Sequence, residues 1–423
     1  MAAEILVIDP GKAEVLSPTD SLSGKHLFVT GVTGFVGKVW LSELLYRVPD
    51  VAHVYVLIRP SKTVSPLKRF ERFAERSPAF RPLRQAHGAA FESFLRQRIT
   101  VLEGDVTEPL CGLDDDALAR LSPQIDAVVH FAGLTDFDPD PLKALEINVH
   151  GAVEVGRLTQ RFPKAKLLHC STCYVAGEVS DTVSESIESG LSPNGQRFDP
   201  VAECDALRAD CEQADAESET QDWREMKRVR IEVGRRRANA LGWANVYTYT
   251  KALAEHLLAT QEVEMSVIRP AVVECSRSYP FPGWNEGINT SGPLLWFLSG
   301  VFRFLPCQGS HLFDVVPVDT VSRATNLALT ALLTGSTGAV YQLGSSQTNP
   351  LTFGRAVELS NLAARRYMNR DDAKPLERYV LRHLDSQPRD WDDTPLMSVP
   401  GFKRLSGGIK RTMNALSLSK VAP

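Results

Sequence analysis

Short apolar runs alternate with helical patterns along the chain from about residue 26 onward. Each run is rich in Val, Ile, Leu or Phe and lacks the strict polar and apolar alternation of a half-exposed strand. Strands buried on both faces have this pattern, which is typical of a parallel sheet covered by helices. We therefore predict an α/β fold with a doubly wound parallel sheet. The predicted strands are His26–Thr30, His53–Ile58, Ile99–Leu102, Ala127–Phe131, Lys166–Cys170 and Met265–Ile268.

Two regions interrupt this alternation and suggest a domain division. Residues 178–240 begin acidic and Ser-rich and end in the charge-dense run Trp223–Arg237, which predicts a helical insertion. A solvated helix pair is the simpler interpretation of that run, and an anionic ligand at its basic end is the alternative. We predict an N-terminal lead (1–22), a dinucleotide-binding domain (23–275), a smaller C-terminal substrate-binding subdomain (276–403) and a basic tail or linker (404–423).

The composition is that of an ordinary globular protein. Lys plus Arg is 47 and Asp plus Glu is 51, a net charge of −4, and 43% of the residues are hydrophobic. These values exclude collagen-like, disordered and nucleic-acid-coating classes, so we expect no nucleic acid partner. The N-terminal stretch does not have the pattern of a secretory signal, and no apolar run reaches the roughly 18 residues of a membrane span. The segment Leu294–Leu305 is expected to be a core or pocket helix, with peripheral membrane contact as the alternative.

The cysteines favour a cytoplasmic setting. There are seven of them, an odd number over a long chain, which argues for reduced thiols. The pair Cys170 and Cys173 forms a CxxC motif with no second pair for a zinc site and no thioredoxin-like context. We therefore predict packing roles for both side chains and no metal site.

The strongest local signal is a glycine-rich turn between the first strand and the helical pattern Lys38–Tyr46. Its spacing, GxxGxxG, resembles that of the short-chain dehydrogenase/reductases, which have Rossmann-type folds. The first glycine permits a tight turn, the second lets the backbone approach a pyrophosphate, and the third lets the helix pack closely. The helix N-terminus offers unpaired N–H groups to the phosphates. The expected cofactor-binding residues are Thr30, Gly31, Thr33, Gly34, Phe35, Val36 and Gly37.

The end of the second strand predicts the choice of cofactor. An NAD site favours an acidic residue here, whereas this chain has Arg59 with Lys62 nearby. A guanidinium pairs with a 2′-phosphate and stacks on adenine, so we predict NADPH.

Later strand ends should complete the cofactor site. Asp105 and Val106 follow the third strand and are expected near the adenine. Ala132 and Gly133 follow the fourth strand and are expected on the ribose side. Asn148 is interpreted as a structural residue that bonds the backbone between central strands.

Tyr247 and Lys251 form a YxxxK pair whose side chains share one helix face. A free phenol has a pKa of about 10, and a nearby ammonium lowers it toward the range useful for proton transfer. Thr172, with its neighbour Ser171, follows the fifth strand and supplies a hydroxyl for a developing oxyanion. Tyr249 fits the spacing less well than Tyr247. These residues predict a reductase active site of the short-chain type.

More specific segments resemble the fatty acyl-CoA reductases. This male-sterility-type branch of the extended short-chain enzymes is related to thioester reductase domains. The resemblance extends from about Ser23 to Leu351, and its most specific part is Pro-Phe-Pro-Gly-Trp. The segments are Gly242–Tyr247, Ile268–Glu274, Pro280–Gly287, Asp314–Asp319 and Gly344–Pro350.

The resemblance implies NADPH-dependent reduction of a long-chain fatty acyl thioester, on coenzyme A or acyl carrier protein. The product is a fatty aldehyde and then a primary fatty alcohol. It implies a triad of Thr172, Tyr247 and Lys251, with Pro270 and Val272 beside the nicotinamide. Substrate contacts are implied for Pro280, Phe281, Trp284 and Gly287. Pro293–Leu305 is expected to line an acyl tunnel or, equally, to be a core helix.

Two other functions use the same fold. A nucleotide-sugar epimerase or sterol dehydrogenase shares the glycine turn and triad but not the Pro-Phe-Pro-Gly-Trp segment. A non-catalytic nucleotide-sensing scaffold would not need the triad. The chain also departs from the family, because many eukaryotic members carry a longer helical C-terminal domain and only about seventy residues follow Pro350. We expect a bacterial-type enzyme or a module of a longer chain.

Overall fold

The computed structural model divides into two compact units. The first comprises residues 1–285 and 316–343, and the second residues 286–315 and 344–423. The structure describes residues 16–61, 63–179, 182–218, 222–287, 304–335, 339–367, 379 and 383–389. Residues 276–285 and 316–343, expected in the substrate lobe, thus fold with the first unit. The assignment of a substrate-binding role to a second lobe stays a prediction.

A seven-stranded parallel sheet forms the centre of the first unit, in the order β10-β6-β5-β4-β1-β2-β3. The chain order reverses between β1 and β4, the place where such sheets bind dinucleotides. The doubly wound α/β fold is confirmed, and a seventh strand joins the predicted six. The strands are β1 His26–Thr30, β2 His53–Ile58, β3 Ile99–Glu103, β4 Ala127–His130, β5 Lys166–Cys170, β6 Met265–Pro270 and β10 Val340–Leu343.

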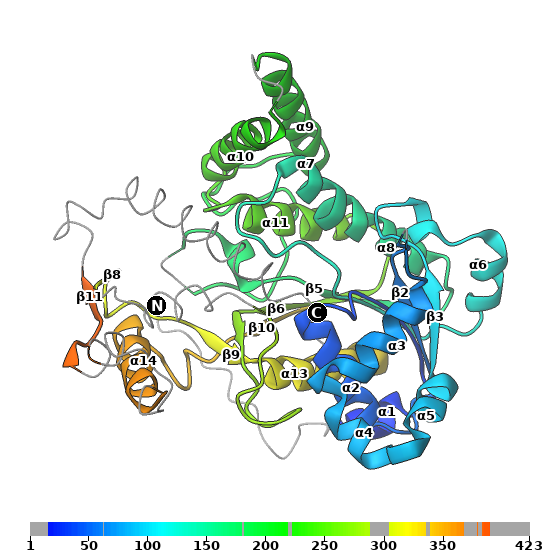
Figure 1. The fold of residues 1–423 in the computed structure, drawn as a ribbon. Helices are drawn as coiled ribbons and strands as arrows, with labels where there is room; N and C mark the ends of the chain where they lie inside the picture. Colours follow the sequence, from blue (N-terminus) through cyan, green and yellow to red (C-terminus); the bar gives the residue numbers. More distant parts are fainter. Residues whose placement is uncertain are drawn as a thin grey trace. The chain divides into compact units, whose positions relative to one another are not determined.

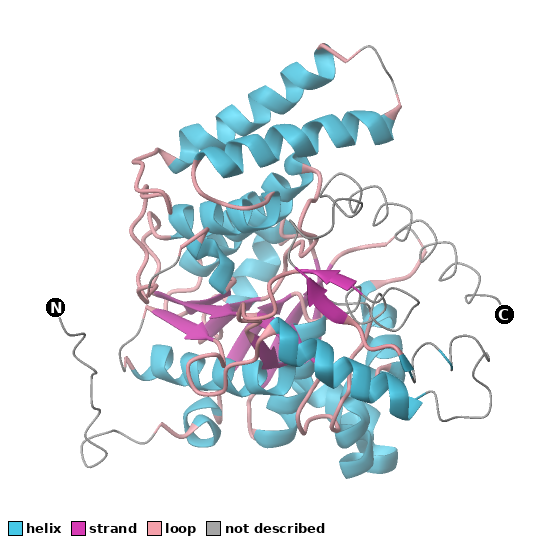
Figure 2. Ribbon diagram, turned by 90° about the vertical axis from the view of Figure 1, so that its left-hand side faces the viewer, coloured by secondary structure: helices cyan, strands magenta, loops and turns pink. Residues whose placement is uncertain are grey.

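Helices cover both faces of the sheet (Figures 1 and 2). Leu27 and Val29 point into the core shared with α2 and α13, whereas Phe28 points into the core shared with α8. This double burial explains why β1 is a continuous apolar run. One layer holds α1 Pro18–Leu22, α2 Phe35–Arg47, α3 Pro66–Arg76, α4 Arg81–His87, α5 Phe91–Arg98 and α13 Val318–Thr334, and the other α6 Asp115–Leu121, α8 Gly151–Gln160 and α11 Val246–Leu258.

Shorter elements lie mainly in the connections. The strands β7 Val272–Glu274 and β9 Val315–Pro317 form a separate two-stranded sheet. A π-helix, Leu145–His150, joins α7 Pro141–Ala144 to α8. The 3-10 turns are Pro78–Phe80, Gly88–Ala90, Pro109–Gly112 and Cys173–Ala176.

The insertion between β5 and α11 ends in a helical hairpin, α9 Pro200–Ala216 and α10 Trp223–Ala240 (Figure 1). The basic run on α10 is largely neutralised within the protein. Arg237 pairs with Glu203 at 2.7 Å, and Arg230 pairs with Asp215 at 2.9 Å, which ties the two helices together. These arginines are therefore engaged in holding the hairpin.

The described residues of the second unit form a small parallel ladder and a long helix. The elements are β8 Phe304–Pro306, β11 Gln387–Arg389 and α14 Phe353–Tyr367. Asp314 accepts hydrogen bonds from the backbone N–H groups of Ser345 and Ser346, at 2.7 and 3.2 Å. Residues 294–303 of the expected apolar helix and the tail 404–423 lie outside the described residues.

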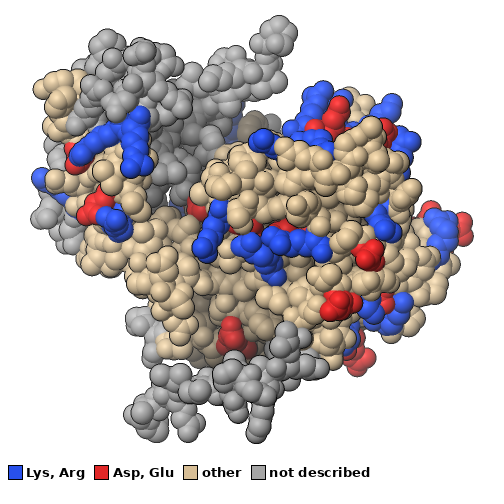
Figure 3. All heavy atoms as spheres, turned by 90° about the horizontal axis from the view of Figure 1, so that it is seen from below, with Lys and Arg blue, Asp and Glu red and all other residues tan. Residues whose placement is uncertain are grey.

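The described surface bears both signs of charge. On the face shown in Figure 3, basic side chains lie among acidic ones. Among the described helices, none has the length and apolar character needed to cross a membrane.

Candidate active site

The glycine turn lies against the end of β4 and leaves no room for side chains. Gly31 has a φ of +76°, and a Cβ there would lie 2.4 Å from the backbone N of Ala132. A Cβ on Gly37 would lie 2.6 Å from the carbonyl oxygen of Gly31. Only glycine accommodates both the left-handed backbone and these contacts. The turn therefore has the shape that close backbone approach to a pyrophosphate requires.

The N-terminus of α2 faces this turn without a side-chain cap. Its N-cap residue, Gly34, makes no side-chain hydrogen bond to the first turn of the helix, and Thr33 is exposed. Phe35 and Val36, the first helical residues, pack partly against the core. An uncapped helix N-terminus beside a glycine cradle suits an anion, so these residues fit the phosphates of a dinucleotide.

Thr30 binds a histidine that sequence reasoning missed. Its hydroxyl lies 2.7 Å from Nδ1 of His130, at the end of the neighbouring strand β4. The backbone N–H of Ala132 donates to the same hydroxyl at 3.4 Å. Burial lowers the pKa of His130 to about 3, so the ring is neutral. Thr30 and His130 thereby brace the strand ends under the glycine turn.

The expected adenine-side residues lie at the ends of β2 and β3. Arg59 is exposed, and its carbonyl oxygen accepts a hydrogen bond from Arg69 at 2.5 Å. Asp105 accepts one from the N–H of Thr107 at 3.1 Å, which leaves its second carboxylate oxygen available to a ligand. Val106 is buried in the core beneath. Lys62 lies outside the described residues.

Tyr247 lies in the first turn of α11, which the side chain of Asn245 caps. Burial raises the pKa of its phenol well above the ordinary value, and a hydrogen bond with the Thr172 side chain opposes this shift. Thr172 makes otherwise long contacts, 3.4 Å to the carbonyl oxygen of Pro270 and 3.4 Å from the N–H of Tyr174. The two hydroxyls therefore lie near each other. The single O–H of Thr172 is directed at the Pro270 carbonyl over a long 3.4 Å, so it must turn from that contact to donate to a substrate oxygen.

Lys251 is buried beneath this pair. Its Nζ donates to the carbonyl oxygen of Cys170 at 2.8 Å and lies 3.2 Å from Nε2 of His169. Burial lowers the pKa of His169 far below its usual value, so the ring is neutral and accepts from the ammonium. Burial also lowers the pKa of Lys251, and the Cys170 and Glu255 side chains oppose that shift. His169 is a second site residue that no sequence motif signalled.

Three further residues lie next to Thr172 in the sequence or close to it: Cys170, Ser171 and Cys173. Among the described residues, the buried hydroxyl of Ser171 has no hydrogen-bond partner. Cys170 and Cys173 form no disulfide, and the described residues contain no cluster suited to a metal ion. Burial raises the pKa of Cys170 to about 11, so its thiol stays protonated.

Asn148 lies in the π-helix and connects the loop after β4 to α11. Its Oδ1 accepts from the N–H of Leu134 at 2.7 Å, and its Nδ2 donates to Thr250 Oγ1 at 3.1 Å. A Cβ on Gly133 would lie 3.2 Å from the same Oδ1. The amide therefore bonds the backbone between central elements, as the structural interpretation proposed.

The residues expected at the substrate lie mostly beside α2. Trp284 is 3% exposed and stacks on Phe35, with ring centroids 5.3 Å apart. The guanidinium of Arg81 lies 5.5 Å from the ring centroid of Phe281, which follows Pro280. Gly287 belongs to the second unit. Their contact with substrate stays a prediction, and Trp284 in this structure supports the first turn of the cofactor helix.

Asp319, from the Asp-Val-Val-Pro-Val-Asp segment, holds the start of the same loop. It is fully buried and accepts from the N–H groups of Arg277 and Ser278 at 2.8 and 2.9 Å. The loop is therefore tied to α13 at Asp319 as well as to α2 at Trp284.

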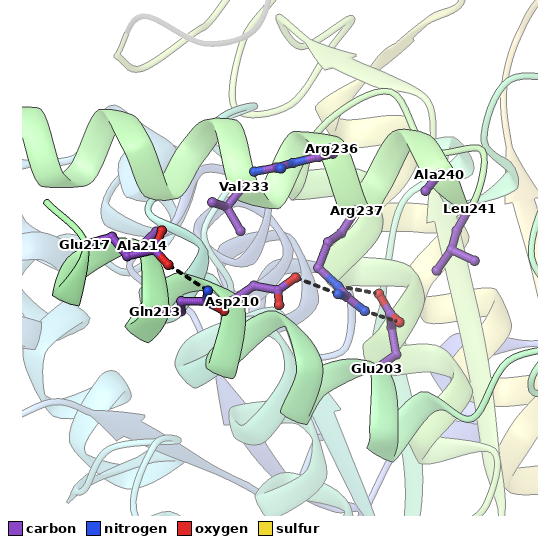
Figure 4. Close-up of a pocket in the computed structure, with 10 residues that line it drawn as sticks. All are labelled: Glu203, Asp210, Gln213, Ala214, Glu217, Val233, Arg236, Arg237, Ala240 and Leu241. Carbon is purple, nitrogen blue, oxygen red and sulfur yellow. Dashed lines mark hydrogen bonds and ion pairs between the residues drawn. The ribbon is translucent and has the colours of Figure 1, made fainter.

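A hollow of about 530 Å³ lies between α9 and α10 (Figure 4). Its lining includes Glu203 and Asp210, each of which forms an ion pair with Arg237. None of the triad residues lines it. The hollow is the groove of the helical hairpin, and the candidate active site lies instead at the carboxyl ends of β1, β4 and β5.

A model of the family described as "Male sterility protein" matches residues 29–325. The chain belongs to this family. Its relatives include fatty acyl-CoA reductase 1 from Arabidopsis thaliana, 31% identical, with 82% of this chain and 72% of the relative covered. The alcohol-forming fatty acyl-CoA reductase from Simmondsia chinensis is also 31% identical, with the same shares covered. This male sterility family member is an oxidoreductase with an NAD(P)-binding domain.

Solved structures share the fold. The terminal R domain of the myxalamid PKS-NRPS biosynthetic pathway matches with a TM-score of 0.56 and 20% identity, over 85% of this chain and 77% of that one. A thiolation-reductase di-domain from an archaeal non-ribosomal peptide synthetase matches with a TM-score of 0.53 and 18% identity, over 88% of this chain and 62% of that one. The doubly wound α/β fold of this family member is therefore shared with these structures.

Proposed function

We propose that this protein uses NADPH to reduce a long-chain fatty acyl thioester, first to the aldehyde and then to the primary alcohol. The observation that carries the proposal is the grouping of Thr172, Tyr247 and Lys251. Thr172 and Lys251 are buried, Tyr247 is half-buried, and the Thr172 side chain interacts with the phenol of Tyr247. This group lies in a chain whose relatives are named as fatty acyl-CoA reductases, one of them alcohol-forming. That kinship favours the thioester over a nucleotide sugar or a sterol.

The residues act on the carbonyl oxygen of the thioester. When bound, NADPH supplies the hydride for the carbonyl carbon. Thr172 and Tyr247 donate hydrogen bonds to the oxygen as negative charge develops on it. Tyr247 then protonates that oxygen, and the hemithioacetal releases its thiol to leave an aldehyde. The ammonium of Lys251 stabilises the phenolate that remains.

The same hydroxyls serve the second reduction. An aldehyde oxygen occupies the position of the thioester oxygen, so Thr172 and Tyr247 again donate to it. A second NADPH, when bound, would supply the hydride for the aldehyde carbon. Tyr247, once it has regained a proton from solvent, would protonate the oxygen to give the alcohol. We propose coenzyme A as the carrier, and the test distinguishes it from acyl carrier protein.

Palmitoyl-CoA should cause loss of NADPH absorbance when it is added to the purified protein. Mass spectrometry with limiting and then excess NADPH should detect hexadecanal and then hexadecanol. Palmitoyl carrier protein, assayed in parallel, identifies the preferred carrier. The proposal fails if neither thioester causes NADPH loss at high protein concentration.

Arg59→Ala should weaken NADPH binding about 10- to 100-fold and leave NADH binding within about twofold. The reason is that a charge-assisted hydrogen bond to the 2′-phosphate contributes roughly 1.5–3 kcal/mol. Binding is measured by titration of the protein with each nucleotide. Arg76→Ala, which removes an exposed arginine of α3, is the matched control. Equal losses for NADPH and NADH would refute the phosphate-binding role of Arg59.

A further inference from the structure

Two exposed aromatic side chains flank the catalytic tyrosine. Phe137 is 49% exposed and Tyr174 is 41% exposed, whereas Trp40, Trp243 and Tyr249 are fully buried. The ring of Phe137 lies edge-on to that of Tyr247, with centroids 6.3 Å apart. The backbone N–H of Tyr174 donates to the hydroxyl of Thr172 at 3.4 Å, which places Tyr174 beside the triad. Apolar surface is therefore exposed next to the atoms that do the chemistry.

The loop that presents Phe137 is firmly held. Its carbonyl oxygen accepts from the N–H of Tyr247 at 3.2 Å. The next residue, Asp138, forms an ion pair with Arg235, and Asp140 forms one with Arg230. Both arginines come from α10, so the helical insertion braces this loop from outside. The exposed ring is thus displayed in a fixed position, which lowers the entropic cost of using it as a binding surface.

The side chains of the Phe137 loop favour an alkyl chain as the ligand. In the proposed function the reacting carbonyl lies at Tyr247, with the acyl chain on one side and the thioester arm on the other. The Phe137 loop also carries Asp136, an exposed carboxylate that would repel the phosphates of coenzyme A. A hydrocarbon gains about fourfold in affinity for each methylene that leaves water.

We propose that Phe137, together with Tyr174, forms the subsite for the methylenes of the acyl chain nearest the reacting carbonyl. This inference rests on the proposed function and adds the surface that selects acyl over shorter or more polar substrates. Trp284, one of the substrate contacts implied by the family resemblance, does not offer such a surface because it is buried against Phe35.

The test is the dependence of kcat/KM on acyl length in Phe137→Ala. We expect about a 10- to 30-fold loss with palmitoyl-CoA and less than about threefold with butyryl-CoA, because the short chain covers less of the ring. Phe137→Leu should recover most of the loss. Tyr174→Ala, on a different element, should likewise lower kcat/KM more with palmitoyl-CoA than with butyryl-CoA. Trp223→Ala, which removes a 65% exposed aromatic from the start of α10, is the matched control and should change nothing.

Inhibition by free coenzyme A tests whether this surface binds the acyl chain or the coenzyme A part of the substrate. Its inhibition constant should be the same in Phe137→Ala and the wild type. Free coenzyme A could inhibit Phe137→Ala more weakly than the wild type while the dependence on acyl length stays unchanged. That result would place the thioester arm on this surface and overturn the proposed acyl subsite. An equal loss for every acyl length would show that the ring only supports the loop, which also overturns it. Absence of any thioester turnover by the wild type would instead defeat the proposed function itself.

Discussion

Tyr247→Phe is expected to lower kcat with palmitoyl-CoA by about 10²- to 10⁴-fold, the usual contribution of a positioned general acid. The substitution removes the phenolic proton and the hydrogen bond with Thr172 but keeps the ring, so NADPH affinity should change by less than about threefold. Steady-state kinetics and nucleotide titration measure the two quantities.

The pH dependence gives a second readout for the same residue. The proposed acid must be protonated, and burial raises the pKa of Tyr247 above its ordinary value of about 10. In the free enzyme the phenol therefore keeps its proton through neutral pH. Its contribution to kcat/KM is lost only as the pH rises through that raised value. We expect no loss of kcat/KM from phenol ionisation between about pH 7 and 9.

Tyr249→Phe is the matched control for Tyr247→Phe. It removes a phenol from the same helix, but one that donates to Glu203 in the hairpin and, within the described part of the chain, has no hydrogen bond to the triad side chains. Its kcat should stay within about threefold of the wild type, whatever happens to stability. Unchanged turnover in Tyr247→Phe, or an equal loss in both variants, would contradict the catalytic assignment of Tyr247.

Glu255→Ala is expected to destabilise the protein by about 3–5 kcal/mol, the usual cost of leaving a buried charge without its partner. Glu255 on α11 and Arg269 on β6 are 3% and 7% exposed, and their side chains meet at 2.6 Å. Among the described residues, the loss would leave the buried guanidinium with a single hydrogen bond, 3.3 Å to the carbonyl oxygen of Ser186. Urea unfolding of the wild type and variant measures the change in the free energy of unfolding.

An exposed ion pair supplies the control for this prediction. Glu264→Ala removes a carboxylate that is 61% exposed and pairs with Lys166, and it should cost less than about 1 kcal/mol. The double substitution Glu255→Leu with Arg269→Met should recover most of the stability, because it leaves no charge unpaired. A cost below about 1 kcal/mol for Glu255→Ala would mean that solvent reaches Arg269.

The core strands could be predicted from sequence because burial on both faces leaves a local signal. Leu27, Phe28 and Val29 face opposite layers, yet all are apolar, so β1 shows as an unbroken run. The strand β10 gave no such signal. Only Val340 of its residues is fully buried, and the edge position leaves Tyr341 and Gln342 half-buried. A short, mixed segment of this kind cannot be told from a loop without its neighbour β6.

The sequence by itself determined the features whose geometry is local. The glycine turn depends on backbone freedom and close packing within a few residues, and Tyr247 and Lys251 share a face because of helical period. Only the tertiary structure decided the long-range partners, such as His130 under Thr30 and His169 under Lys251, which lie 100 and 82 residues apart. The spacing of motifs along the chain does not reveal which strand ends will lie side by side in the fold.

The same dependence on long-range contacts explains why the predictions about surface residues were incomplete. In sequence, the Pro-Phe-Pro-Gly-Trp segment suggests substrate contacts, and the basic run of α10 suggests a solvated helix pair, with an anionic ligand as the alternative. In the fold, Arg235 is bound to Asp138 and Trp284 lies against Phe35, so their side chains are engaged with the protein. Phe137, which belongs to no motif, is exposed beside Tyr247 because its loop is held from α10 and α11. Composition and spacing set the available chemistry, and packing decides which side chains are left to perform it.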